Sequence, residues 1–146
     1  MAVCTPPEEL VGYGALLQYY NNLTSAWVTV GGTKDLEYPE DETPAVETTA
    51  GDTGSGYTTR IPSLLSTLNE VTYTLSYRWS QYTVLRGIKE NRDVLEWRVV
   101  LMNPEQTYIK FCAFISALSV AIPMEELVEF DLTLNPTGGP ELGELV

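Results

Sequence analysis

The 146-residue sequence carries 20 acidic residues, 8 basic residues and no histidine, which gives a formal net charge of −12. This surplus of acids disfavours binding to nucleic-acid phosphates, which requires an excess of Lys and Arg. The lack of histidine excludes Ser-His-Asp and Cys-His catalytic groups, and with only two cysteines a zinc site is close to excluded. An apolar share of 44% at this length predicts one folded domain over residues 1–146 that needs no metal or cofactor.

The chain is expected to begin with an extended tail over residues 1–11, where Pro6 and Pro7 oppose regular structure. These residues lack the basic and apolar regions of a signal peptide. Residues 12–20 and 25–30 are apolar and favour strands, and the Asn21-Asn22 turn between them predicts a hairpin. The redox state of Cys4 and Cys112 stays open, although the apolar strand pattern around Cys112 suggests a small core residue.

Residues 34–60 form a long polar arm, rich in Thr, Gly and Pro, of the length expected for a functional or disordered loop. We expect it to be mobile alone, with Thr and Val residues that could pair as a hairpin once a neighbour supplies a surface. The alternative is a flexible loop without a function. Its acids, with no base among them, are Asp35, Glu37, Glu40, Asp41, Glu42, Glu47 and Asp52; they lack the spacing of a calcium-binding loop.

Regular elements follow the arm. Val71, Tyr73, Leu75, Tyr77 and Trp79 alternate with polar residues, which predicts a half-buried strand. A short helix is expected over 81–91, with Ser80 as its N-cap and Val84, Leu85 and Ile88 on its apolar face.

Three more strands are expected, over 95–101, 107–115 and 128–135, the last stopped by the NPTGGP stretch and followed by a C-terminal tail over 136–146. The order of strands, one helix and further strands predicts a mainly β fold. It would be an antiparallel β-sandwich or small open barrel with one short flanking α-helix and a long extended arm.

The search for chemistry finds no phosphate-binding glycine loop, and acid pairs such as Glu125-Glu126 are typical of a solvated surface. We therefore expect that the chain is not an enzyme. The apolar run over 111–122 falls short of the roughly 20 residues that a membrane helix needs. Aromatic residues such as Tyr20, Trp27 and Trp79 could line a sugar-binding groove, but several alternate in register with aliphatic residues and read as core.

The order of these parts resembles the tail tube (major tail) proteins of long-tailed bacteriophages and gene transfer agents. The resemblance covers residues 12–138: the hairpin, the arm, a strand ending in SYRW, the helix and the strand LEWRVVLMN. Its most specific part is FCAFISALSVAIPMEELVEFDLTLNPTG, over residues 111–138, although no single motif is diagnostic.

The resemblance implies a structural virion protein that assembles with itself as stacked hexameric rings into a hollow tail tube. It implies passage of double-stranded DNA through the lumen without specific binding, assembly in the host bacterial cytoplasm, and tape-measure, tail-tip and tail-terminator proteins as partners. The arm would reach a neighbouring subunit or ring. An acidic lumen would let DNA slide, and the candidates to face it are Glu70, Thr72, Thr74, Glu129 and Asp131. The opposite assignment, with these residues on an ordinary solvent-facing strand surface, stays open.

Two alternatives remain at this stage. One is a monomeric β-sandwich that binds a carbohydrate or a protein. The other is a different tail component with the same fold, such as a tail terminator or the inner tube of a contractile tail.

Overall fold

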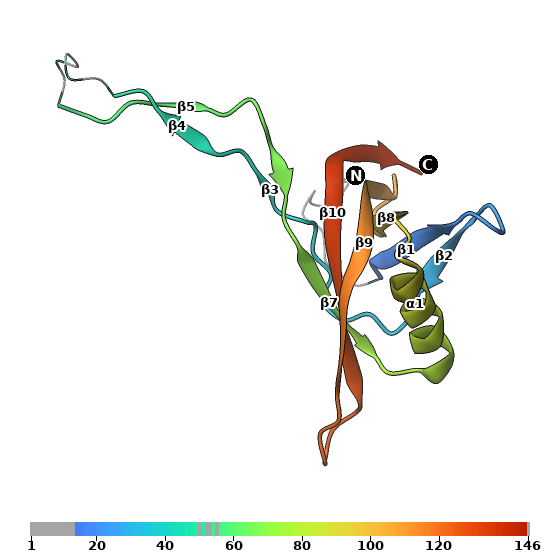
Figure 1. The fold of residues 1–146 in the computed structure, drawn as a ribbon. Coiled ribbons are helices and arrows are strands. Elements are labelled where there is room, and N and C mark those ends of the chain that lie inside the picture. Colours follow the sequence, from blue (N-terminus) through green and yellow to red (C-terminus); the bar gives the residue numbers. More distant parts are fainter. Residues whose placement is uncertain (1–13, 50, 52–53, 55, 146) are drawn as a thin grey trace, which may run out of the picture.

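A computed structural model describes residues 14–49, 51, 54 and 56–145 of the chain. Its centre is a six-stranded antiparallel sheet of order β2-β1-β8-β9-β10-β7, with one helix packed beside it (Figure 1). The sheet strands are β1 (Leu16–Asn21), β2 (Ala26–Val30), β7 (Val71–Ser76), β8 (Leu95–Val100), β9 (Thr107–Ala121) and β10 (Glu129–Glu144). The helix is α1 (Trp79–Asn91), and four short strands form the arm: β3 (Asp41–Glu42), β4 (Ala45–Glu47), β5 (Arg60–Pro62) and β6 (Thr67–Leu68). The predicted mainly β fold with one short helix is confirmed.

One face of the sheet carries the hydrophobic core. The period-two alternation places every second side chain of these strands on this face, where α1 covers it with Leu85. The largest fully buried side chains are Trp97, Tyr73, Phe111, Phe130, Leu17, Leu75, Leu85, Leu132, Leu134, Val99 and Val100. The opposite face of the sheet is not covered by the helix, and Cys112 lies on it, exposed, so its predicted core position was wrong.

The sheet curls back on itself through two glycines. After β2, Gly31 and Gly32 lead the chain to the outer edge of β7, where Thr33 forms a bridge with Leu75. The Ser76 N–H donates to the Gly32 carbonyl at 3.0 Å. The chain that follows the edge strand β2 thus contacts β7, the strand at the opposite edge of the sheet. Gly32 has φ +75°, a left-handed conformation that only glycine adopts at low cost. The result is the open barrel that the order of elements predicted.

Helix α1 begins two residues earlier than predicted and without the expected cap. Its N-cap residue is Arg78, which forms no capping hydrogen bond from its side chain, and Ser80 lies inside the first turn. The Gln81 amide instead accepts from the Gly31 N–H at 2.9 Å and donates to the Gly31 carbonyl at 2.8 Å. This tertiary anchor replaces a local cap, which explains why the N-cap rule misplaced the helix start.

Strands β9 and β10 are longer than predicted and form a projecting hairpin (Figure 1). The NPTGGP stretch does not stop β10. It forms an irregularity between Thr137 and Glu141, after which pairing with β9 resumes to Glu144. Gly138, with φ +84°, supplies the left-handed residue of this bulge. Residues 136–144 are therefore part of the sheet, not a free tail.

The arm is an extended two-stranded ribbon that projects from the body (Figure 1). Its pairing, β3 with β6 and β4 with β5, needs no neighbouring molecule. Hydroxyl pairs join the two sides, Thr43 with Ser66 at 2.7 Å and Thr48 with Thr59 at 2.9 Å. The second side of the ribbon runs from Thr59 to Leu68, mostly beyond the predicted end of the arm, and the expectation that pairing needs a neighbour's surface was wrong for the described residues.

No helix among the described residues is long and apolar enough to cross a bilayer.

Candidate functional site

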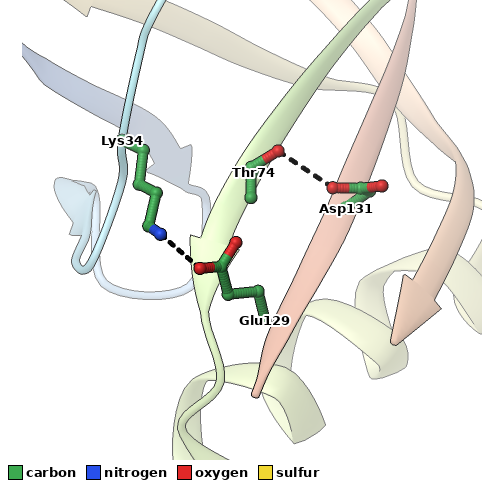
Figure 2. Close-up of polar contacts among 4 residues, drawn as sticks. All are labelled: Lys34, Thr74, Glu129 and Asp131. Carbon is green, nitrogen blue, oxygen red and sulfur yellow. Dashed lines mark hydrogen bonds and ion pairs between the residues drawn. The ribbon is translucent and has the colours of Figure 1, made fainter. Parts of the chain in front are cut away.

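Four of the five predicted lumen residues lie together on the uncovered face of β7 and β10. Asp131 pairs with Thr74 in the register of the two strands, and the Thr74 hydroxyl donates to its carboxylate at 2.9 Å (Figure 2). Two register positions away, on the same face, Thr72 pairs with Thr133, and their hydroxyls lie 3.1 Å apart. Glu70 precedes β7 and is exposed outside this network.

Glu129, the fourth of these residues, forms an ion pair with Lys34 (Figure 2). Lys34 reaches it from the segment that crosses the edge of β7, where the Lys34 N–H donates to the Thr74 carbonyl at 3.2 Å. A base at the start of the acidic arm thus neutralises one of the three predicted lumen carboxylates. The face is less acidic than the sequence alone suggests.

The same uncovered face continues over β1, β2, β8 and β9 with residues that sequence reasoning missed. Arg98 stacks on the Trp27 ring, 4.1 Å from its centroid, and its Nε donates to Gln18 at 2.7 Å. Partial burial is the main cause that lowers the pKa of Arg98. The alternation of Arg98 with the buried Trp97 and Val99 was the signal that could have placed it here.

Lys110 also lies on this face, beside two carboxylates. Its Nζ is 3.0 Å from Glu141 and 3.9 Å from Glu96. The hydrogen bond to Glu141 is the main cause that raises the pKa of Lys110. Lys34 and Lys110 on the uncovered face are thus paired with acids, and Arg98 is stacked on an aromatic ring.

The predicted arm acids divide between the body and the ribbon. Asp35 and Glu37 lie in the segment beside the body, which packs Leu36 against the core. Glu40, Asp41, Glu42 and Glu47 are exposed at or along the ribbon, and none of them forms an ion pair with a described residue. Asp52 lies outside the described residues. The ribbon thus carries unneutralised acids far from the core.

Exposed apolar side chains concentrate on parts that project from the body. On the ribbon and its root they are Val46, Ile61, Leu64 and Leu65, and at the tip of the β9–β10 hairpin they are Ile122, Met124 and Leu127. Single exposed apolar residues are ordinary, but clusters on projecting elements mark interaction surfaces. These clusters are typical of a subunit that contacts other chains.

The described residues hold no cluster of acids and cysteines that could bind a metal. The aromatic side chains that could have lined a sugar groove take different positions. Tyr73 and Trp97 are buried in the core, Trp27 stacks with Arg98 on the uncovered face, and Trp79 is exposed at the start of α1. Tyr19 and Tyr20 line a hollow between the β1–β2 hairpin and α1.

This fold, an open antiparallel barrel with one flanking helix and a long arm, is the fold of tail tube proteins. The chain superimposes on the tail protein of an empty gene transfer agent particle solved with C6 symmetry, with a TM-score of 0.76 and 12% identity over 92% of this chain and 99% of the other. It superimposes on the SPP1 tail tube with a TM-score of 0.62 and 13% identity, over 94% of this chain and 81% of the other.

A third solved structure, the sheath/tube terminator of the extracellular contractile injection system PVC, matches with a TM-score of 0.68 and 12% identity, over 97% of this chain and 99% of the other. No family model matches the sequence. No curated protein is similar to it in sequence. At 12–13% identity the likeness to these structures is one of fold.

Proposed function

We propose that this chain is a structural, non-enzymatic tail tube subunit. Copies would close into hexameric rings that stack into a hollow tube for double-stranded DNA. The observation that carries the proposal is the two-faced sheet: α1 and the core lie on one side, and the other side is uncovered. Full-length superposition on tail components of gene transfer agents and phages supports the same class.

The uncovered face is the one we assign to the lumen. In a ring of such subunits the sheets would join edge to edge, with α1 outside and the uncovered face inside. DNA slides past a surface only if no free cation holds its phosphates. On this face Lys34 pairs with Glu129 and Lys110 pairs with Glu141, while Arg98 stacks on Trp27. These contacts support a passage that does not bind DNA.

The exposed ribbon supports the role of an inter-subunit arm. It carries acids that form no ion pair with a described residue and apolar side chains in water, a combination that an isolated domain does not need. Tape-measure, tail-tip and terminator proteins are the further partners that this role requires. The particle would be assembled in the host cytoplasm and the chain would end in the virion tail.

A second candidate function has one specific observation in its favour. The contractile-system terminator matches over 99% of its own length, so the chain could instead serve as an inner tube or terminator subunit. A terminator caps one end and forms a single ring, whereas a tube subunit polymerises without limit.

Sedimentation velocity and negative-stain electron microscopy of the concentrated chain separate these functions. Long hollow tubes are expected for a tail tube subunit. Single rings of fixed size would favour a terminator. A monomer at every concentration would contradict the proposed function and favour a monomeric binding module.

A further inference from the structure

A groove on the outer side of the molecule runs between α1 and the β1–β2 hairpin. Its volume is about 540 Å³. Three of its apolar lining residues face water, Leu23 with 96%, Val84 with 51% and Val94 with 54% of their surface exposed. Val94 also borders a second hollow of about 380 Å³, which continues toward β9 and includes Phe114. We call the two hollows together the helix groove.

Gly87 lies in the middle of α1 and lines the helix groove. A glycine inside a helix is destabilising relative to alanine. Nothing in the described chain accounts for it, because a Cβ added there would meet no atom within 4 Å. A missing side chain with open space beside it fits the close approach of a group from another molecule.

The end of the helix groove near Val94 is positively charged. Lys89 and Arg92 line this end together with Ser116 and apolar residues, and no acid lines it. Neither base forms an ion pair within the described chain. Of the acids nearby, Glu90 pairs with Arg86 and Asp93 lines the other hollow. A partner that presents an apolar surface beside acids would complement this groove.

The tip of the β9–β10 hairpin has these properties. Ile122, Met124 and Leu127 are 78%, 101% and 75% exposed, and Glu125 and Glu126 lie between them in the sequence. Figure 1 shows the hairpin projecting below the body, in a direction away from the β1–β2 hairpin at the right. The tip therefore does not fill the groove of its own chain.

We propose that the β9–β10 tip of one copy docks into the helix groove of a second copy. The apolar tip residues fill the space beside Gly87 and Val94, and Glu125 and Glu126 meet Lys89 and Arg92. Because donor and acceptor surfaces differ, the contact is heterologous and propagates from copy to copy. This inference rests on the proposed function, since it names the surfaces through which assembled copies meet.

Charge reversal with rescue tests the proposal on the full chain. Two double variants, E125K/E126K and K89E/R92E, each place like charges in the contact, which opposes association. We expect each to raise the critical concentration for assembly by at least about tenfold, and the quadruple variant, with both surfaces reversed, to return to within about threefold of wild type. The control E105K reverses an exposed acid in the turn after β8 and should assemble normally.

Normal assembly of either double variant, or no rescue in the quadruple variant, would overturn the docking proposal while the tube function stands. A wild-type chain that stays monomeric at every concentration would overturn both.

A second variant, Gly87→Leu, should affect stability and assembly in opposite directions. Leucine is the better helix former and its Cβ would meet no atom within 4 Å, so the unfolding midpoint should stay equal or rise. The added side chain fills the groove, so assembly should be lost. Assembly equal to wild type in this stabilised variant would contradict the proposed occupancy of the groove.

Discussion

Tyr73 connects the core to the root of the arm. Its ring is fully buried, and its hydroxyl donates to the Glu37 carbonyl at 2.7 Å. Burial, and to a lesser degree the charge of Glu37, raises the pKa of the Tyr73 phenol well above its ordinary value. This hydrogen bond helps to hold the segment that leaves the body toward the ribbon.

Replacing Tyr73 by phenylalanine removes that bond and should lower the free energy of unfolding by about 1 kcal/mol at pH 7. A raised pKa contributes stability that is present below the unfolded value of about 10 and is lost as pH rises further. The wild type should therefore lose about 1.4 kcal/mol more than the variant one pH unit above 10. Urea denaturation at pH 7 and pH 11 measures this, and a difference between the two proteins that does not change with pH would contradict it.

At the residue scale the sequence predicts the core well where a strand is regular. The alternation identified Val71, Tyr73 and Leu75 as one buried face. It failed at Trp79, which is 69% exposed, because the strand ends at Ser76 and the chain turns into the helix. The polar contacts of the uncovered face, such as Lys34 with Glu129, join residues far apart in sequence and leave no local pattern.

At the scale of elements, the ribbon is the part that the body does not need for its core. Its root is tied down by Leu68, which is buried, and by the pairing of Glu42 with Thr67. Those two paired positions allow the ribbon to be removed without a gap: residues 43–66 can be replaced by an Asn-Gly turn, which suits a two-residue hairpin.

We expect this shortened chain to fold with an unfolding midpoint close to wild type, since the core is retained. It should fail to form long tubes, because the exposed apolar side chains of the arm and the acids Glu47 and Asp52 are gone. Circular dichroism checks the fold, and electron microscopy measures tube length. Tubes of normal length from the shortened chain would refute the role of the arm in assembly.

The elements also show what a single segment cannot reveal. The composition of residues 34–60 predicted a polar arm, but its pairing partner lies in residues 60–68, outside that biased stretch. The NPTGGP stretch has the residues of a strand terminator, yet β9 is long enough to resume pairing beyond it. In both segments the structure depends on pairing between strands far apart in the sequence, which local turn residues do not predict.

At the scale of the whole molecule, the orientation of the sheet in the proposed tube decides which residues would face DNA. Cys112 is exposed on the uncovered face and provides a native probe of that orientation. In a chain with Cys4 replaced by serine, a small maleimide should label Cys112 in both monomer and tube. A polyethylene-glycol maleimide too large to enter the lumen should label it only in the monomer.

The matched control places the cysteine at Arg86, on the exposed side of α1, with both native cysteines replaced by serine. This position should react with the large reagent in monomer and tube alike. Full labelling of Cys112 in the tube by the large reagent would place the uncovered face outside and reverse the assignment of the lumen.

The charge of −12 is unevenly distributed over the molecule. The arm carries acids without ion-pair partners, while Glu129 on the uncovered face is paired with Lys34 and Asp131 accepts from Thr74. Changing Asp131 to lysine should make assembled tubes retain linear double-stranded DNA at low salt and release it at high salt. Asp131→Asn is the control that changes the charge without adding a cation. Equal, negligible retention of DNA by all three tubes at low salt would show that Asp131 does not face the passage.

Electron cryomicroscopy of the concentrated wild-type chain tests both the proposed tube and the orientation of its subunits. We predict hollow tubes of stacked sixfold rings, with α1 on the outer wall and the face that carries Asp131 and Arg98 toward the lumen. A chain that stays monomeric at high concentration, or that forms filaments without a lumen, would contradict it.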